Sequence, residues 1–75
     1  MSLKQIILDV SELEAPYPLI EASRAIKDLK DDEELIFKHR MFPHKLQNIL
    51  DKFECKSEVL KDKENYFEMK ITRIL

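Results

Sequence analysis

The chain contains no glycine among its 75 residues. Loops that cradle phosphate groups depend on glycine, because a residue without a Cβ lets backbone N–H groups approach the phosphates closely. Neither a P-loop nor a dinucleotide-binding turn can be built without it. The absence of glycine therefore argues against the usual modes of nucleotide binding.

Cysteine and long apolar runs are also scarce. Cys55 is the single cysteine and has no partner within the chain for a disulfide, which favours a reducing compartment, so we expect a cytoplasmic protein. The sequence has no run of about 18 apolar residues, and its first residues lack a basic segment followed by an apolar stretch. It therefore predicts no membrane span, no signal peptide and no membrane partner.

An excess of positive charge is missing as well. The formal net charge is −2, whereas a surface that binds a nucleic-acid duplex needs clustered lysine and arginine to neutralise the phosphates. We therefore expect no nucleic-acid partner. The hydrophobic and charged fractions, 44% and 37%, are those of one small globular domain with a thin core.

The first half of the chain predicts a strand, a helix and a second strand. Ile6, Leu8 and Val10 alternate with other residues in a strand that ends near Ser11, and a helix follows Pro18. Residues 34–39 are rich in β-forming side chains and predict the second strand. The apolar stripe of the helix consists of Leu19, Ala22, Ile26 and Leu29. A strand–helix–strand order implies a parallel strand pair joined by a right-handed crossover.

The second half predicts another helix and then a hairpin. Pro43 opens the helix, and the spacing of residues 46, 49, 50 and 53 is typical of an apolar stripe that faces a core. From residue 54 the period changes to two, with a turn over residues 62–65 and a last strand whose apolar face carries Phe67, Met69 and Ile71. The summed order is βαβαββ. We expect an α+β fold, a two-layer α/β sandwich with two helices on one face of a four-stranded mixed sheet.

Several short segments carry a family resemblance by their order and spacing. They are Leu8-Asp9-Val10, Leu13, Pro16-x-Pro18-Leu19, His39, Pro43, Leu46, Leu50 and Ile71-x-Arg73. In this order they resemble the TusA/SirA-like superfamily of small sulfur-carrier proteins. The resemblance implies that residues 1–75 form one TusA-like domain, with sheet order 1-2-4-3 and the fourth strand antiparallel to the others.

The residue that carries sulfur in that superfamily is replaced in this chain. The carriers have a Cys-Pro-x-Pro corner whose cysteine, at a helix N-terminus, holds a persulfide, and the helix end lowers the thiol pKa. The matching residues here are Ala15-Pro16-Tyr17-Pro18, so the carrier chemistry cannot be transferred to residue 15. The chain looks most like short bacterial TusA-like domains that lack this cysteine.

A candidate binding site follows from the predicted topology. The loops after two parallel strands leave the same edge of a sheet, where binding crevices of open α/β sheets occur, and helix N-termini attract anions. We therefore expect a site that engages a protein partner or a small anionic ligand. Its expected members are Ala15, Pro16, Tyr17, Pro18, His39, Arg40 and His44. The alternative is that Pro16, Tyr17 and Pro18 only shape the corner.

Other reactive side chains are expected to be structural. Burial without reactivity is the expectation for Cys55, although a sulfur-transfer protein that uses Cys55 as a persulfide acceptor is the alternative function. His39, His44 and Cys55 fall short of the four ligands of a structural zinc site. The sequence therefore predicts no metal, no cofactor and no catalytic residue, and a module that is not an enzyme.

Two kinds of association stay open at this stage. The sheet face opposite the helices could pair two copies into a homodimer. The apolar residues expected there are Ile7, Ile36, Tyr66 and Ile74. RNA binding is a second alternative function, suggested by similar folds in ribosome-associated proteins and opposed by the acidic charge.

Overall fold

The structure is a computed structural model and describes residues 3–74. Its elements are β1 (Lys4–Asp9), α1 (Tyr17–Asp28), β2 (Glu33–His39), α2 (Leu46–Lys52), β3 (Cys55–Lys63) and β4 (Tyr66–Arg73). This βαβαββ order confirms the prediction. Within the described part of the chain, neither helix has the length and apolar character needed to cross a bilayer.

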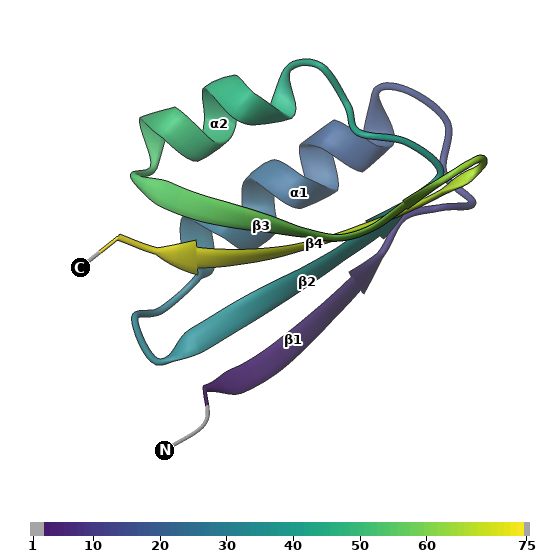
Figure 1. Cartoon of the computed structure of the whole chain (residues 1–75). Helices are drawn as coiled ribbons and strands as arrows, with labels where there is room; N and C mark the ends of the chain where they lie inside the picture. The colour runs from purple at the N-terminus through teal and green to yellow at the C-terminus, as the bar shows by residue number, and fades with distance from the viewer. Residues whose placement is uncertain (1–2, 75) are drawn as a thin grey trace.

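The four strands form one mixed sheet in the order β1-β2-β4-β3. β1 and β2 are parallel, and β4 runs antiparallel to both of its neighbours, β2 and β3. Both helices lie on the same side of this sheet (Figure 1). The two-layer fold, the strand order and the strand directions are therefore as predicted.

The core lies between the helices and the central strand β2. Leu35 and Phe37 of β2 are fully buried, together with Ile26 of α1 and Leu46 and Leu50 of α2. Removing a side chain of this size from water stabilises the fold by roughly 1.5–3 kcal/mol. A few large side chains therefore hold the helix layer on the sheet.

Both helices begin at slightly different residues than predicted. α1 begins at Tyr17, so Pro18 lies inside its first turn, where the missing N–H of proline leaves no hydrogen bond unmade. α2 begins at Leu46 rather than at Pro43, because the Leu46 N–H donates to the Pro43 carbonyl at 3.1 Å in a tight turn before the helix. The Ala15–Pro16 peptide bond is cis.

The hairpin is tighter than predicted. Asp62 and Lys63, expected in the turn, continue β3 and pair with Phe67 and Tyr66 of β4, so the turn shrinks to residues 64 and 65. Asn65 has a φ of 62°, a left-handed conformation that asparagine tolerates better than most residues. The tip of this hairpin extends beyond the helices (Figure 1).

The open face of the sheet carries less exposed apolar surface than predicted. Ile36 was expected to be exposed there but is only 5% exposed, because it lies on the central strand with Ile7 of β1 and Lys70 of β4 as its pairing partners. Ile7 and Ile74 are 55% and 56% exposed, and Tyr66 is half-buried. Ile7 lies beside Ile36 in the β1–β2 pair, whereas Ile74 lies after the end of β4.

Arg73 connects the end of β4 to the C-termini of both helices. Its guanidinium donates to the carbonyl oxygens of Leu29 at 2.8 Å and Ile26 at 3.0 Å, at the end of α1, and to that of Phe53 at 2.7 Å, at the end of α2. The last carbonyls of a helix have no partner within the helix. Arg73 therefore has a structural role that accounts for its place in the closing Ile71-x-Arg73 segment.

Candidate functional site

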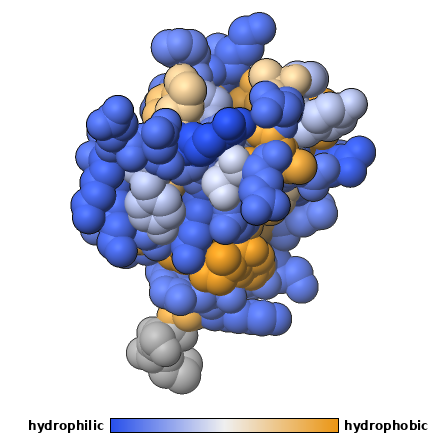
Figure 2. All heavy atoms as spheres, turned by 90° about the vertical axis from the view of Figure 1, so that its right-hand side faces the viewer, coloured by the Kyte–Doolittle hydropathy of each residue, from blue (hydrophilic) through white to orange (hydrophobic). Residues whose placement is uncertain are grey.

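The loops after β1 and β2 meet at one end of the molecule, because the two strands are parallel and end together. Arg40 joins them: its Nη2 donates to the Leu13 carbonyl oxygen at 3.0 Å and lies 3.9 Å from the Glu14 carboxylate. Figure 2 faces this end of the molecule and shows apolar surface between polar side chains. The convergence of the two loops is the arrangement predicted from the topology.

A cavity of about 470 Å³ lies between these two loops. Six of the seven residues predicted for the site line it: Ala15, Pro16, Pro18, His39, Arg40 and His44. Tyr17 is the exception. Its side chain is 58% exposed and does not belong to the lining, because the buried stripe of α1 runs through Pro18, Ala22 and Ile26, and residue 17 is offset from it.

Six further residues line the cavity that were not predicted individually, although Met41 and Pro43 lie within the predicted loop from His39 to His44. They are Leu13, Glu14, Leu19, Met41, Pro43 and Lys45. Most are direct neighbours of the predicted residues, so extending each predicted loop by two residues would have found them. Met41 had no signal of its own in the sequence.

His39 is the most deeply buried polar side chain of the site. It is 7% exposed, and its Nδ1 atom is buried without a hydrogen-bond partner among residues 3–74. Burial, followed by the positive charge of Arg40, lowers the pKa of His39 below its usual value of 6.5. The imidazole is therefore neutral at neutral pH, and its ring nitrogens can donate or accept a hydrogen bond without a full charge.

Two of the exposed charged groups around the cavity are cationic. Arg40 and Lys45 are exposed, and Glu14 is the one carboxylate that the structure describes in the lining. The first turn of α1 contains no acidic residue, so the positive potential of this helix end is not compensated within the helix. These charges favour a ligand with negative charge.

Cys55 lies at the opposite end of the sheet. β2 and β3 both run antiparallel to β4, and β1 is parallel to β2, so β1, β2 and β3 run in the same direction. Cys55 is the first residue of β3, whereas the cavity lies where β1 and β2 end. The side chain is 6% exposed, and its thiol lies 3.7 Å from the Phe53 carbonyl oxygen. Burial raises the pKa of the Cys55 thiol, and Arg73 opposes this only in part. The predicted burial of Cys55 is confirmed.

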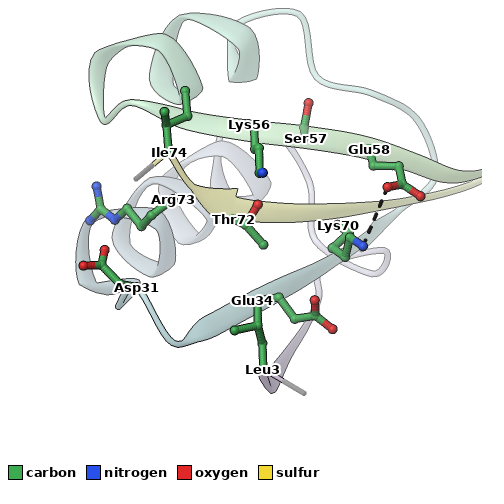
Figure 3. A pocket seen from close by; sticks show the side chains of 10 residues that line it. All are labelled: Leu3, Asp31, Glu34, Lys56, Ser57, Glu58, Lys70, Thr72, Arg73 and Ile74. Atoms are coloured by element: carbon green, nitrogen blue, oxygen red, sulfur yellow. Dashed lines mark ion pairs between the residues drawn. The ribbon is translucent and has the colours of Figure 1, made fainter. Parts of the chain in front are cut away.

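A second concave region lies on the open face of the sheet, between the start of β3, the end of β4 and the start of β2 (Figure 3). Its volume is about 580 Å³. Several of its charges already have partners: Lys70 pairs with Glu58 at 3.7 Å, and Glu34 accepts a hydrogen bond from Gln5 at 2.7 Å. The guanidinium of Arg73 is bound to backbone carbonyls. Four of its six charged side chains therefore already have a partner.

Metal ligands do not cluster in the part of the chain that the structure describes. Residues 3–74 contain no group of three or more His, Cys, Asp and Glu side chains placed to hold a metal ion. His39, His44 and Glu14 line the same cavity, but they are not placed to hold one metal ion together.

Comparison with known proteins adds one finding. A protein-family model described as sulfurtransferase TusA matches residues 6–73, which reaches from within β1 to the end of β4. No curated protein and no solved structure matches the chain.

Proposed function

Because the chain belongs to the TusA family, we propose that it is a non-catalytic binding or accessory module of the TusA-like fold, acting in the cytoplasm. It engages a protein partner or a small anion through residues 15–18 and 39–44. The observation that carries this proposal is that both loops line the same cavity of about 470 Å³. The helix end and the cationic side chains around it give the cavity its preference for negative charge.

The chemistry of the residues supports binding rather than sulfur transfer. Residue 15, at the corner before α1, is an exposed alanine without a sulfur atom. A persulfide carrier needs an accessible thiolate as the nucleophile, and Cys55 has a buried thiol with a raised pKa. Sulfur transfer through Cys55 therefore stays the alternative function, and the structure gives it no accessible reaction site.

Titration of the isotope-labelled protein with sulfate and phosphate tests the anion part of the proposal. We expect amide chemical-shift changes confined to residues 13–19 and 39–45. Ala15→Trp, which places an indole ring in the cavity, should abolish the changes. Ser57→Trp is the matched control, because residue 57 is also small and exposed but lies on β3, outside this cavity.

A photoreactive amino acid tests the partner part. Placed at residue 15 of the protein in its own cells, it should form a covalent adduct with a defined protein, whereas the same group at residue 57 should not. Amide changes that spread evenly over the sheet, together with equal crosslinking from both positions, would contradict the proposal.

A further inference from the structure

The cavity between the two loops combines an apolar wall with a polar end. Leu13, Pro16, Leu19, Met41 and Pro43 supply hydrocarbon surface on several sides. An inorganic anion would leave this surface in contact with water, whereas a ligand with its own hydrocarbon group would bury it. The apolar wall therefore points to an organic ligand.

The polar end of the cavity contains a buried imidazole. His39 lines the cavity, is more than nine-tenths buried, and has an Nδ1 atom without a hydrogen-bond partner in the described chain. The Nδ1 atom has almost no accessible surface, so a ligand cannot reach it directly. The ring still lines the cavity, and a head group with a hydrogen-bonding atom can bind against the accessible edge of the imidazole.

The formal charge of the lining limits the charge of that head group. Arg40 and Lys45 carry two positive charges, and Glu14 carries one negative charge, 3.9 Å from Arg40. These three charged side chains have an excess of one positive charge. One negative charge on the ligand compensates this excess, and phosphate groups would bring more.

The volume of the cavity fits a small molecule. Sites for small ligands measure roughly 300–1,000 Å³, and this cavity of about 470 Å³ lies in the lower part of that range. It is large enough for an acid with a short alkyl chain or one aromatic ring.

From these observations we infer that the cavity binds a small organic monocarboxylate. Its carboxylate faces His39 and the cationic side chains, and its hydrocarbon group lies against the apolar wall. This inference rests on the proposed function, since it assigns a ligand class to the same two loops.

A series of matched ligands tests the inference. Acetate, isovalerate and phenylacetate share the carboxylate and differ in hydrocarbon surface, while phenylacetamide has the same ring without the charge. In calorimetry and amide-shift titrations of the full chain, we expect phenylacetate or isovalerate to bind at least about tenfold more tightly than acetate, and more tightly than phenylacetamide by a similar factor. The ring-nitrogen signals of His39 should move in the same titrations.

Two variants locate the binding. Ala15→Trp should remove it, and Ser57→Trp should leave it unchanged. His39→Gln should weaken it about tenfold, and an amide spectrum that is native outside the two loops shows that the variant is folded.

Other outcomes separate this inference from the proposed function. Equal affinity for phenylacetate and phenylacetamide, or for acetate and phenylacetate, overturns the inference. So does binding of a peptide with a free C-terminal carboxylate when no free acid binds. In each of these cases shifts confined to the two loops would leave the proposed function standing, whereas loops that respond to no anion and crosslink to no protein would contradict both.

Discussion

The Nη2 atom of Arg40 donates a hydrogen bond to the carbonyl oxygen of Leu13 at 3.0 Å. This bond connects the loop after β2 with the loop after β1, and the two loops are otherwise separate in sequence. Arg40 also lies 3.9 Å from the Glu14 carboxylate. One exposed side chain thus fixes the relative position of the two walls of the cavity.

Replacing Arg40 by glutamine should weaken ligand binding more than folding. The side chain is exposed, so the free energy of unfolding should fall by no more than about 1 kcal/mol. The affinity for a monocarboxylate should fall about tenfold, because a charge-assisted hydrogen bond and the link between the loops are both lost. Calorimetric titration and urea denaturation measure the two effects.

The control for this variant is Arg24→Gln. Arg24 is an exposed arginine on α1, 3.7 Å from Glu21, and does not line the cavity. It should leave the affinity unchanged. Equal losses of affinity in the two variants would show that only the overall charge of the protein matters.

Cys55 should react slowly with alkylating reagents. Burial raises its pKa, so the fraction of nucleophilic thiolate at neutral pH is smaller than for a free cysteine, and the reagent must also reach a thiol that is 6% exposed. The rate with iodoacetamide should therefore be at least about tenfold lower in the native protein than in urea. Cys55→Ser should bind ligand like the wild type. Fast native alkylation would favour the sulfur-transfer alternative.

The lowered pKa of His39 should make the protein less stable in mild acid. The unfolded chain binds a proton at His39 near the ordinary pKa of 6.5, while the folded protein does so only at lower pH. Between these two values the unfolded state binds more protons, so stability decreases as the pH falls. Urea denaturation at about pH 7.5 and about pH 5.5 should show this loss.

Two variants test whether His39 causes the pH dependence of stability. In His39→Gln the decrease in stability between the two pH values should be smaller than in the wild type, whatever the absolute stability of the variant. His44→Gln is the control, because His44 is exposed in the loop before α2, and it should keep the wild-type dependence. An unchanged pH dependence in His39→Gln would show that other groups cause it.

The fold could be predicted from the sequence because its signals are local and agree with one another. Alternation in β4 places Phe67, Met69 and Ile71 on the core side, and all three are buried. The proline corner indicated where α1 begins to within one residue. In a chain this short, periodicity and element order leave few ways to bury the apolar stripes.

The remaining differences arise from contacts between distant segments. Ile36 is buried on the open face by neighbouring strands, and alternation alone cannot report that shielding. Pro43 is compatible with a first helical turn and with a turn before the helix, and the hydrogen bond from Leu46 selects the second. Met41 lines the cavity because of the course that its loop takes, and no sequence pattern predicts the course of a loop.

Replacing Glu54 by glycine should stabilise the fold. It follows α2 with a φ of 55°, a left-handed conformation that costs a residue with a Cβ roughly 1–2 kcal/mol, and the greater backbone entropy of an unfolded glycine offsets part of the gain. Glu54→Gly should therefore increase the free energy of unfolding by about 0.5–1 kcal/mol. Glu64→Gly, in the hairpin turn without a positive φ, should bring no increase, and a gain in both variants would argue against the conformational explanation.

Arg73→Lys should destabilise the fold although the charge is retained. The guanidinium donates hydrogen bonds to the carbonyls of Leu29, Ile26 and Phe53 at the same time. A lysine ammonium is a compact group without the planar, forked arrangement of donors, so it cannot make these bonds together. The carbonyls that lose their partner lie at partly buried helix ends, so the cost should be about 2 kcal/mol. Arg24→Lys, at a side chain that is 75% exposed, should cost almost nothing. Urea denaturation of both variants measures the difference, and equal stabilities would mean that water replaces the guanidinium at the helix ends without loss.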